Sequence, residues 1–195
     1  LGPPGTGKTT KLLKYVQTFL KLGTPIEKIG YFAFTKKAAT EAKERMLKLF
    51  PQYGYRDLNH FQTLHSLAFN TLGMKKDNVM QPEHYEELGR TIGVQVSVSR
   101  GGEEETGYID SDSEYFNLIN IARIKNITPK DEYNTDLYSD EIDYNLVEII
   151  EAELKNYKSS FVLYDFTDMI EKFVSSELCP KFDVVFIDEA QDLSP

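Results

Sequence analysis

The sequence has few of the residues that build disulfides and metal centres. It contains a single cysteine, Cys179, and three histidines, His60, His65 and His84. One cysteine cannot form an internal disulfide, and these residues do not have the spacing of a metal-binding motif. We therefore expect a reducing, cytoplasmic setting and a buried Cys179 without a catalytic role.

Long apolar runs are also missing. No uninterrupted apolar stretch approaches the ~20 residues that cross a bilayer, and no charged segment leads into an apolar leader. A membrane partner is therefore not expected. The chain begins with Leu1, one residue before a glycine-rich stretch, and we interpret it as a fragment of a longer protein.

Positive charge is scarce overall but unevenly placed. The 195 residues have a net charge of −9, which argues against nonspecific coating of nucleic acid. Residues 1–73, however, hold 11 Lys and Arg against 4 Asp and Glu, whereas residues 74–195 hold 11 against 27. This asymmetry indicates either an uneven surface composition or a phosphate-rich ligand that meets the first part of the chain.

Hydrophobic periodicity predicts alternating helices and strands outside the middle of the chain. Such alternation is typical of an α/β fold with a parallel sheet flanked by helices. Helices are expected over residues 12–20, 35–50, 64–72, 146–157 and 164–174, and strands over 29–34, 57–62 and 184–187.

The middle of the chain, residues 74–142, has little sustained periodicity. It contains the acidic stretch RGGEEETGYIDSDSE and the polar stretch ITPKDEYNTDLYSDE, which we interpret as solvated loops among short helices. We therefore predict a core domain formed by residues 1–73 and 143–195, interrupted by an acidic, mainly helical insert over 74–142.

The opening stretch GPPGTGKT matches the phosphate-loop pattern G-x-x-x-x-G-K-[ST]. Its backbone N–H groups and the following helix start are expected to hold the phosphates of ATP, with Lys8 at the β and γ oxygens and the Thr9 hydroxyl at Mg²⁺. The predicted nucleotide-binding residues are Gly2, Pro3, Pro4, Gly5, Thr6, Gly7, Lys8, Thr9 and Thr10.

Near the other end of the chain, the apolar run VVFI leads into two acids, Asp188 and Glu189. A phosphate loop needs an acid on a neighbouring strand to help hold the metal, which we assign to Asp188, and a base for the attacking water, which we assign to Glu189. Lys8 and Asp188 lie 180 residues apart. Ring ATPases of the AAA+ type place the second motif much sooner, so the spacing requires an insert.

Four further segments follow the phosphate loop in a characteristic order. FTKKAATEAKERM, TLHSLA, YDFTDM and FIDEAQDLSP resemble the successive motifs of superfamily 1 DNA helicases of the UvrD/Rep/PcrA type. The resemblance covers both ends of the chain and leaves about residues 74–142 unmatched. It implies a RecA-like ATP-binding domain with an inserted subdomain. The chain departs from many members in having Thr10 where they carry an arginine.

The resemblance also implies functions for individual residues. Phe34, Thr35 and Lys36 would lie along single-stranded DNA, where an aromatic ring stacks on bases and a lysine reaches phosphate. Thr63 and His65 would contact the DNA backbone. Gln191 would sense the γ-phosphate or the attacking water, and is counted with Lys8 and Glu189 as catalytic. Asp165, Phe166 and Asp168 match an element that we interpret as structural.

By resemblance, the complete protein would be an ATP- and Mg²⁺-dependent helicase or translocase that moves 3′ to 5′ on single-stranded DNA and at single-strand/duplex junctions. It would be a cytoplasmic, prokaryotic or viral protein acting in DNA repair or replication. Arginine fingers of a second motor domain complete such sites, so we expect the present chain alone to be inactive. The alternatives are an AAA+-type ATPase or nucleotide kinase, or a nucleotide-gated binding module without turnover.

Overall fold

The computed structural model describes residues 7–96, 98–100, 109–111, 113–135 and 142–190 of the chain. The predicted site residues Gly2, Pro3, Pro4, Gly5, Thr6 and Gln191, and most of the acidic stretch of the insert, lie outside these ranges. The elements are α1 (Lys8–Lys21), β1 (Ile29–Phe32), α2 (Lys36–Leu49), β2 (Phe61–Gln62), α3 (Leu64–Thr71), α4 (Pro82–Ile92), β3 (Val98–Arg100), β4 (Ile109–Ser111), α5 (Glu114–Ile124), α6 (Pro129–Tyr133), α7 (Tyr144–Phe161), α8 (Phe166–Ser176) and β5 (Val184–Ile187).

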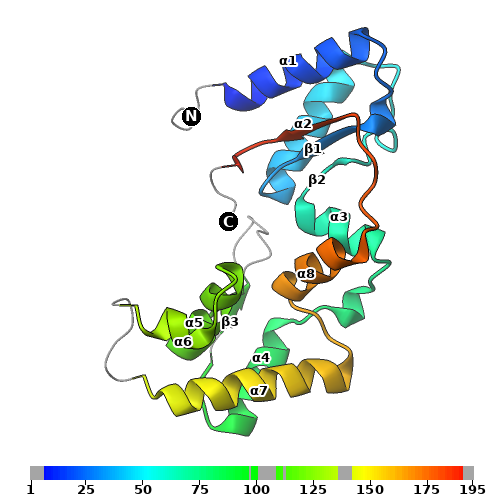
Figure 1. The fold of residues 1–195 in the computed structure, drawn as a ribbon. Coiled ribbons are helices and arrows are strands. Elements are labelled where there is room, and N and C mark those ends of the chain that lie inside the picture. The colour runs from blue at the N-terminus through cyan, green and yellow to red at the C-terminus, as the bar shows by residue number, and fades with distance from the viewer. Residues whose placement is uncertain (1–6, 97, 101–108, 112, 136–141, 191–195) are drawn as a thin grey trace.

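A small parallel sheet lies in the part of the molecule that contains α1 and β5, the first and last of the described elements (Figure 1). The strand order is β2-β1-β5, and β1 pairs in parallel with both neighbours. The register aligns Phe61, Tyr31 and Phe186 across the three strands, so these side chains share one face. The predicted parallel sheet with helices is thus present, in a chain that is mostly helical.

Helices α1 and α2 cover this face of the sheet. Leu13 and Val16 of α1 and Ala42 and Met46 of α2 are buried in one hydrophobic cluster with Tyr31 and its neighbours on the sheet. The opposite face is more open, because Val185 and Ile187 of β5 are 45% and 42% exposed. Burial of the first face therefore fixes how the start of α1 lies against the end of β5.

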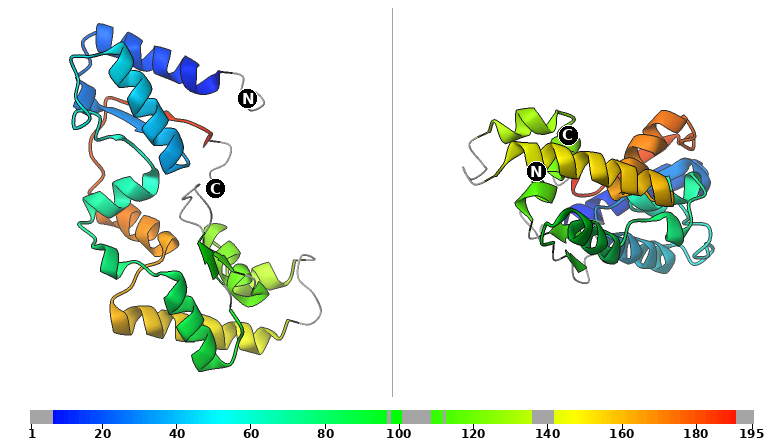
Figure 2. Two further views of the ribbon diagram at one scale, coloured as in Figure 1. Left: turned by 180° about the vertical axis from the view of Figure 1, so that it is seen from behind. Right: turned by 90° about the horizontal axis from the view of Figure 1, so that it is seen from below.

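The insert forms a second hydrophobic cluster, at the far end of the molecule (Figures 1 and 2). It is more regular than the predicted loops and short helices. Helix α4 begins with Pro82, whose fixed φ suits a first helical position, and ends at Gly93, which adopts a left-handed φ of 75°. Helix α5 buries Phe116, Leu118 and Ile119. Strands β3 and β4 pair antiparallel.

Helix α7 packs with the insert. Its buried residues Val147, Ile150 and Leu154 belong to the same cluster as Leu88 of α4 and Phe116 of α5. The sequence boundary between residues 142 and 143 stays a prediction, but this packing favours a boundary after α7. The apolar stripe of α7 was recognisable in the sequence, whereas its partner was not.

The chain leaves and re-enters the sheet-bearing part through two adjacent segments. Val79 and Tyr164 form an isolated parallel bridge, and the Met80 N–H donates to the Tyr164 carbonyl at 3.0 Å. Next to this crossing, α3 and α8 pack together through Ala68 and Met169. The insert is therefore joined to the rest of the molecule by paired connections and by α8.

Two local expectations were wrong. The strand expected over residues 57–62 is only β2, because residues before it form turns in which the Gly54 N–H donates to the Asp57 carboxylate at 2.7 Å. Cys179 is exposed rather than buried. Across the described ranges, every helix is too short or too polar to cross a bilayer.

Candidate nucleotide-binding site

The described part of the phosphate loop is its last turn, where Gly7 precedes helix α1. Gly7 has a φ of 76°, a left-handed conformation that an L side chain rarely adopts. Its carbonyl accepts the first helical hydrogen bond, from the Lys11 N–H at 2.9 Å. Helix α1 has no acidic residue in its first turn, so the positive end of its dipole is left for a phosphate. Lys8, half-buried, is its first residue.

Asp188 follows strand β5 and lies beside the start of α1. Its N–H donates to the Phe32 carbonyl at 2.8 Å, which extends the pairing of β5 with β1. Its carboxylate is buried, with only 4% of the residue exposed. The Thr9 hydroxyl donates to Asp188 Oδ2 at 2.7 Å. The fold thus joins two residues of predicted function that are 179 positions apart.

A second hydroxyl binds the same carboxylate oxygen. Tyr31, in the central strand β1, donates from its hydroxyl to Asp188 Oδ2 at 2.7 Å. Its ring is fully buried and stacks on Phe61 with the centroids 5.2 Å apart. Burial and the bond to Asp188 raise the pKa of Tyr31 above its usual value, so the phenol stays protonated and acts as the donor.

Glu189 comes next and adopts a left-handed backbone conformation. Its φ is 56°, which is uncommon for a residue other than glycine and costs of order 1 kcal/mol or more. The other described non-glycine residues with positive φ include Val162 and Glu177, which end helices α7 and α8. Glu189 instead lies in the turn after β5, where its side chain is exposed beside the buried Asp188.

Thr10 lies on the outer side of α1. Its hydroxyl accepts a hydrogen bond from Arg45 Nη1 of α2 at 3.2 Å, and Arg45 also pairs with Glu41 one turn earlier. Thr10 lines an open pocket of about 570 Å³ together with Gly7, Lys11, Lys14, Tyr15 and Thr18. An arginine therefore reaches this position from another helix.

The residues predicted to contact DNA lie at the same edge of the sheet as Asp188, because α2 and α3 follow the carboxyl ends of β1 and β2. Phe34 is half-buried and Lys36 is exposed. Thr35 caps α2, since its hydroxyl oxygen accepts from the Ala38 N–H at 3.1 Å. Thr35 therefore has a local structural role whether or not it reaches a phosphate.

Thr63 and His65 start the neighbouring helix. Thr63 is buried, and its hydroxyl oxygen caps α3 by accepting from the Ser66 N–H at 3.1 Å. His65 packs edge-on against Phe166 of α8 with ring centroids 5.2 Å apart. Burial lowers the pKa of His65, so a neutral imidazole with one N–H donor stands there at neutral pH.

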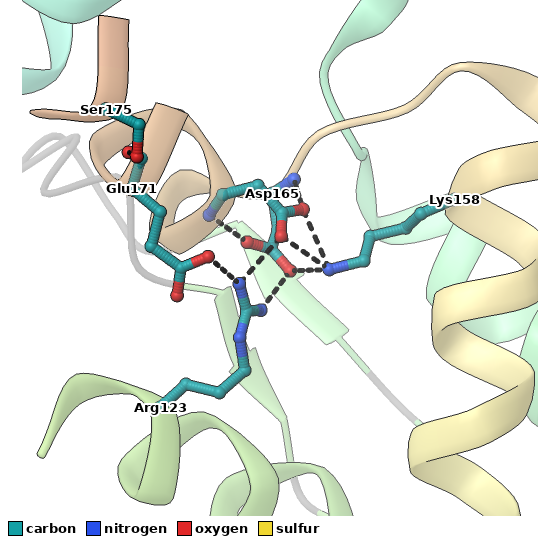
Figure 3. A network of polar contacts seen from close by, with 6 residues as sticks. Arg123, Lys158, Asp165, Glu171 and Ser175 are labelled. Atoms are coloured by element: carbon teal, nitrogen blue, oxygen red, sulfur yellow. Dashed lines mark hydrogen bonds and ion pairs between the residues drawn. The ribbon is translucent and has the colours of Figure 1, made fainter. Parts of the chain in front are cut away.

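A network of ion pairs connects the insert to α8 (Figure 3). Arg123 of α5 donates to Asp165 Oδ2 and Asp168 Oδ1, both at 2.7 Å. Lys158 of α7 reaches the same two carboxylates, each at 2.7 Å. The two aspartates also cap α8, since the Asp168 N–H donates to Asp165 at 2.8 Å and the Asp165 N–H donates to Asp168 at 2.9 Å. Asp165 and Asp168 thus have the structural role expected from the sequence.

Asp165 is charged in this network despite its burial. Desolvation raises its pKa, but the charges of Lys158 and Arg123 outweigh this and hold the pKa below the usual 3.8. A depressed carboxyl pKa contributes stability that is fully present above pH 3.8 and is lost as the pH falls through the folded-state value. The join between the insert and α8 is therefore stable at neutral pH and weakens in acid.

Replacing Arg123 by alanine should loosen this join. Lys158 still pairs with both carboxylates, so we expect the free energy of local opening to fall by about 2 kcal/mol, which is below the range for an uncompensated buried charge. This corresponds to about 30-fold faster amide exchange at the start of α8. Hydrogen exchange read by mass spectrometry on the complete protein measures this.

The matched control is Arg90→Ala, which removes an exposed arginine of α4 and should leave the α8 amides unchanged. The difference in melting temperature between wild type and Arg123→Ala should persist at neutral pH and shrink below pH 3.8. Equal protection of the α8 amides from exchange in the wild type and Arg123→Ala would show that Arg123 does not stabilise the start of α8.

The sequence reasoning missed Tyr31, Arg45, Arg123 and Lys158. Tyr31 was hidden in an apolar strand, where a tyrosine is an ordinary core residue. The other three are single basic residues in helices, without a motif of their own. A tyrosine in a central buried strand is the one signal available beforehand, because a buried hydroxyl needs a partner.

Here a glycine turn leads into a helix, and an acid at the end of a nearby parallel strand is hydrogen-bonded to the first turn of that helix. This arrangement defines a phosphate-loop nucleotide-binding domain. The model of the UvrD/REP helicase N-terminal domain family matches residues 1–195. The chain belongs to this family, and membership implies the RecA-like form of the phosphate-loop fold.

A curated relative supports the same family. A probable DNA helicase of Mycoplasma pneumoniae is 42% identical to the chain over 65 residues. The matched segment is 33% of this chain and 12% of the relative's length, so the likeness concerns a small part of a much longer protein.

Proposed function

We propose that the chain is the ATP-binding motor domain of an ATP-dependent DNA helicase or translocase. The contact between the Thr9 hydroxyl and Asp188 carries this proposal, because it joins the two halves of a phosphate-loop ATPase site across the whole insert. Family membership supports DNA as the substrate. Four finer parts of the proposal rest on the motif resemblance alone. They are movement from 3′ to 5′, action at single-strand/duplex junctions, a cytoplasmic location and a role in repair or replication.

The residues fit a magnesium ion. Asp188 is a buried carboxylate whose two side-chain hydrogen bonds, both 2.7 Å long, come from neutral hydroxyls, and across the described ranges no lysine or arginine pairs with it. A buried carboxylate without a cation is costly, and hydroxyl and carboxylate oxygens are the ligands that Mg²⁺ prefers. Thr9 and Asp188 would hold the ion, which when bound offsets charge on the β and γ phosphates.

The other residues of the site have distinct proposed roles. The loop from Gly2 to Gly7 and the start of α1 would bind the phosphates through the backbone N–H groups of their non-proline residues, with Lys8 adding a positive charge. Thr10 lies beside the pocket on α1 and would face the nucleoside side. Glu189 would accept the proton of the attacking water, and Gln191 would sense the γ-phosphate.

We further propose that DNA crosses the carboxyl edge of β1 and β2. Lys36 would contact phosphate, and Phe34, half-buried but not enclosed in the core, would stack on a base. Thr63, which caps α3, and His65, in its first turn, would contact the DNA backbone. We assign no DNA contact to the insert, which we place within residues 74–163 on the packing of α7.

The test is ATP hydrolysis by the complete protein with and without single-stranded DNA. We expect turnover to require Mg²⁺ and to rise at least about tenfold with DNA, because in the proposed helicase a second motor domain would supply the arginines that complete the site when DNA is bound. Turnover that is indifferent to DNA would favour another class of ATPase. Nucleotide binding without turnover would indicate a nucleotide-gated binding module.

A further inference from the structure

We infer that Tyr31 is a positioning residue of the nucleotide site, whose hydroxyl holds the Asp188 carboxylate in the orientation that binds Mg²⁺. The inference rests on the proposed function, since it needs Asp188 to be a metal-holding residue. No motif includes Tyr31, and its role follows from the contacts of β1 alone.

Packing does not explain the hydroxyl of Tyr31. The ring is fully buried on the face of the sheet covered by α1 and α2, and it stacks on Phe61 at an interplanar angle of 8°. Phenylalanine would make the same ring contacts. A buried hydroxyl adds a desolvation cost unless it is hydrogen-bonded. The Tyr31 hydroxyl donates its hydrogen bond to Asp188 Oδ2 at 2.7 Å.

The register of the sheet places the two side chains together. Tyr31 pairs with Phe186 across β1 and β5, and Asp188 follows two residues later on the same face. A tyrosine is long enough to reach the carboxylate from there, whereas Ala33, which is nearer along the strand, has no polar side-chain group. The hydrogen bond from the Asp188 N–H to the Phe32 carbonyl fixes the backbone of Asp188 beside β1.

Both hydroxyls donate to the same oxygen of Asp188. Thr9 and Tyr31 each donate to Oδ2 at 2.7 Å, which fixes the plane of the carboxylate and uses the two lone pairs of that oxygen. Among the described residues, none donates to Oδ1. Tyr31 and Thr9 together therefore hold the carboxylate through Oδ2 and leave Oδ1 for a metal ion, and groups that orient a metal-holding residue in this way tune its affinity.

Thr9 alone does not fix the carboxylate. Its hydroxyl belongs to the metal site itself, at the first turn of α1 beside the phosphate loop, so its position depends on what the loop holds. Tyr31 is held instead by the pairing of β1 with both neighbouring strands and by the Phe61 stack. Tyr31 therefore supplies the fixed donor, and Thr9 the one that responds to the nucleotide and metal.

The experiment compares wild type, Tyr31→Phe and Tyr157→Phe in the complete protein. Tyr157 is a matched control, because its hydroxyl donates to the Glu87 carboxylate at 2.7 Å, but within the insert. Binding of a fluorescent ADP analogue is titrated in EDTA and then across a range of Mg²⁺ concentrations. Melting temperatures of the three proteins are measured alongside.

We expect Tyr31→Phe to need about tenfold more Mg²⁺ to reach half of the metal-dependent gain in ADP affinity, the lower end of the effect of residues that orient metal ligands. Affinity in EDTA should match wild type, since the phosphate loop is intact. Tyr157→Phe should match wild type throughout.

Three results would overturn the inference, and they separate its failure from that of the proposed function. An unchanged Mg²⁺ requirement in Tyr31→Phe would leave the hydroxyl a purely structural role. Weaker ADP binding in EDTA as well would indicate a distorted pocket rather than a misplaced carboxylate. A wild-type protein whose ADP binding ignores Mg²⁺ would remove the metal site itself, and the proposed function with it.

Discussion

Replacing Lys8 by alanine is expected to abolish DNA-stimulated ATP hydrolysis by the complete protein, with a fall in kcat of at least about 100-fold. Lys8 is the first residue of α1, between the glycine turn and Thr9, and is half-buried. Its ammonium group is the one side-chain charge that the motif directs at the β and γ phosphates. Phosphoryl transfer depends almost entirely on positioning and on such charges, so no other residue of α1 replaces it.

The control is Lys21→Ala, which removes an exposed lysine at the other end of the same helix. It lowers the charge of the protein equally but should leave turnover within about twofold of wild type, as surface substitutions away from a site usually do. A colorimetric phosphate assay at saturating single-stranded DNA measures both variants. Wild-type turnover in Lys8→Ala would refute the assignment of the phosphate loop.

The regular elements were predictable where local pattern and local structure agree. The helix after the phosphate loop was expected from apolar residues that repeat from Leu12 to Leu20, and α1 buries Leu13 and Val16 against the sheet. The first four residues of the run IGYFAF form β1, Ile29–Phe32, and VVFI forms β5. Short apolar runs bounded by turns carry this information without knowledge of their partners.

The local sequence pattern did not predict which elements pack against each other. The apolar stripe of α7 predicted a helix but not its packing partner, and the structure shows that α7 packs with Leu88 and Phe116. The turns before β2 were likewise missed, because Leu58 is apolar and buried without being in a strand. Tertiary context decides such cases.

The residues of the candidate site also fall into a group that the sequence predicted and a group that it did not. Thr9 and Asp188 were predictable because each belongs to a sequence motif, and their contact is what the motifs require. Tyr31 and Arg45 reach the site from β1 and α2 through strand register and helix packing, which no spacing rule encodes. Motifs therefore identified the groups expected to touch ATP and its metal, and not the residues that hold those groups in place.

Glu189→Gln should separate binding from turnover. The variant keeps the size of the side chain but removes the carboxylate that would accept a proton from water, so we expect kcat to fall by about 10²–10⁴, the range for loss of a general base. Affinity for ATP should stay close to wild type, because Lys8, Thr9 and Asp188 are untouched. Single-turnover hydrolysis and equilibrium binding of a fluorescent nucleotide measure the two effects independently.

The chain offers a closely matched control in Glu177→Gln. Glu177 is also an exposed glutamate with a left-handed backbone, at a φ of 54° against 56° for Glu189, but it ends α8 away from the nucleotide site. It therefore controls for both the loss of charge and the strained conformation. If Glu189→Gln turned over ATP as fast as Glu177→Gln, the base would have to be another residue, and the left-handed turn after β5 would serve only to position Asp188.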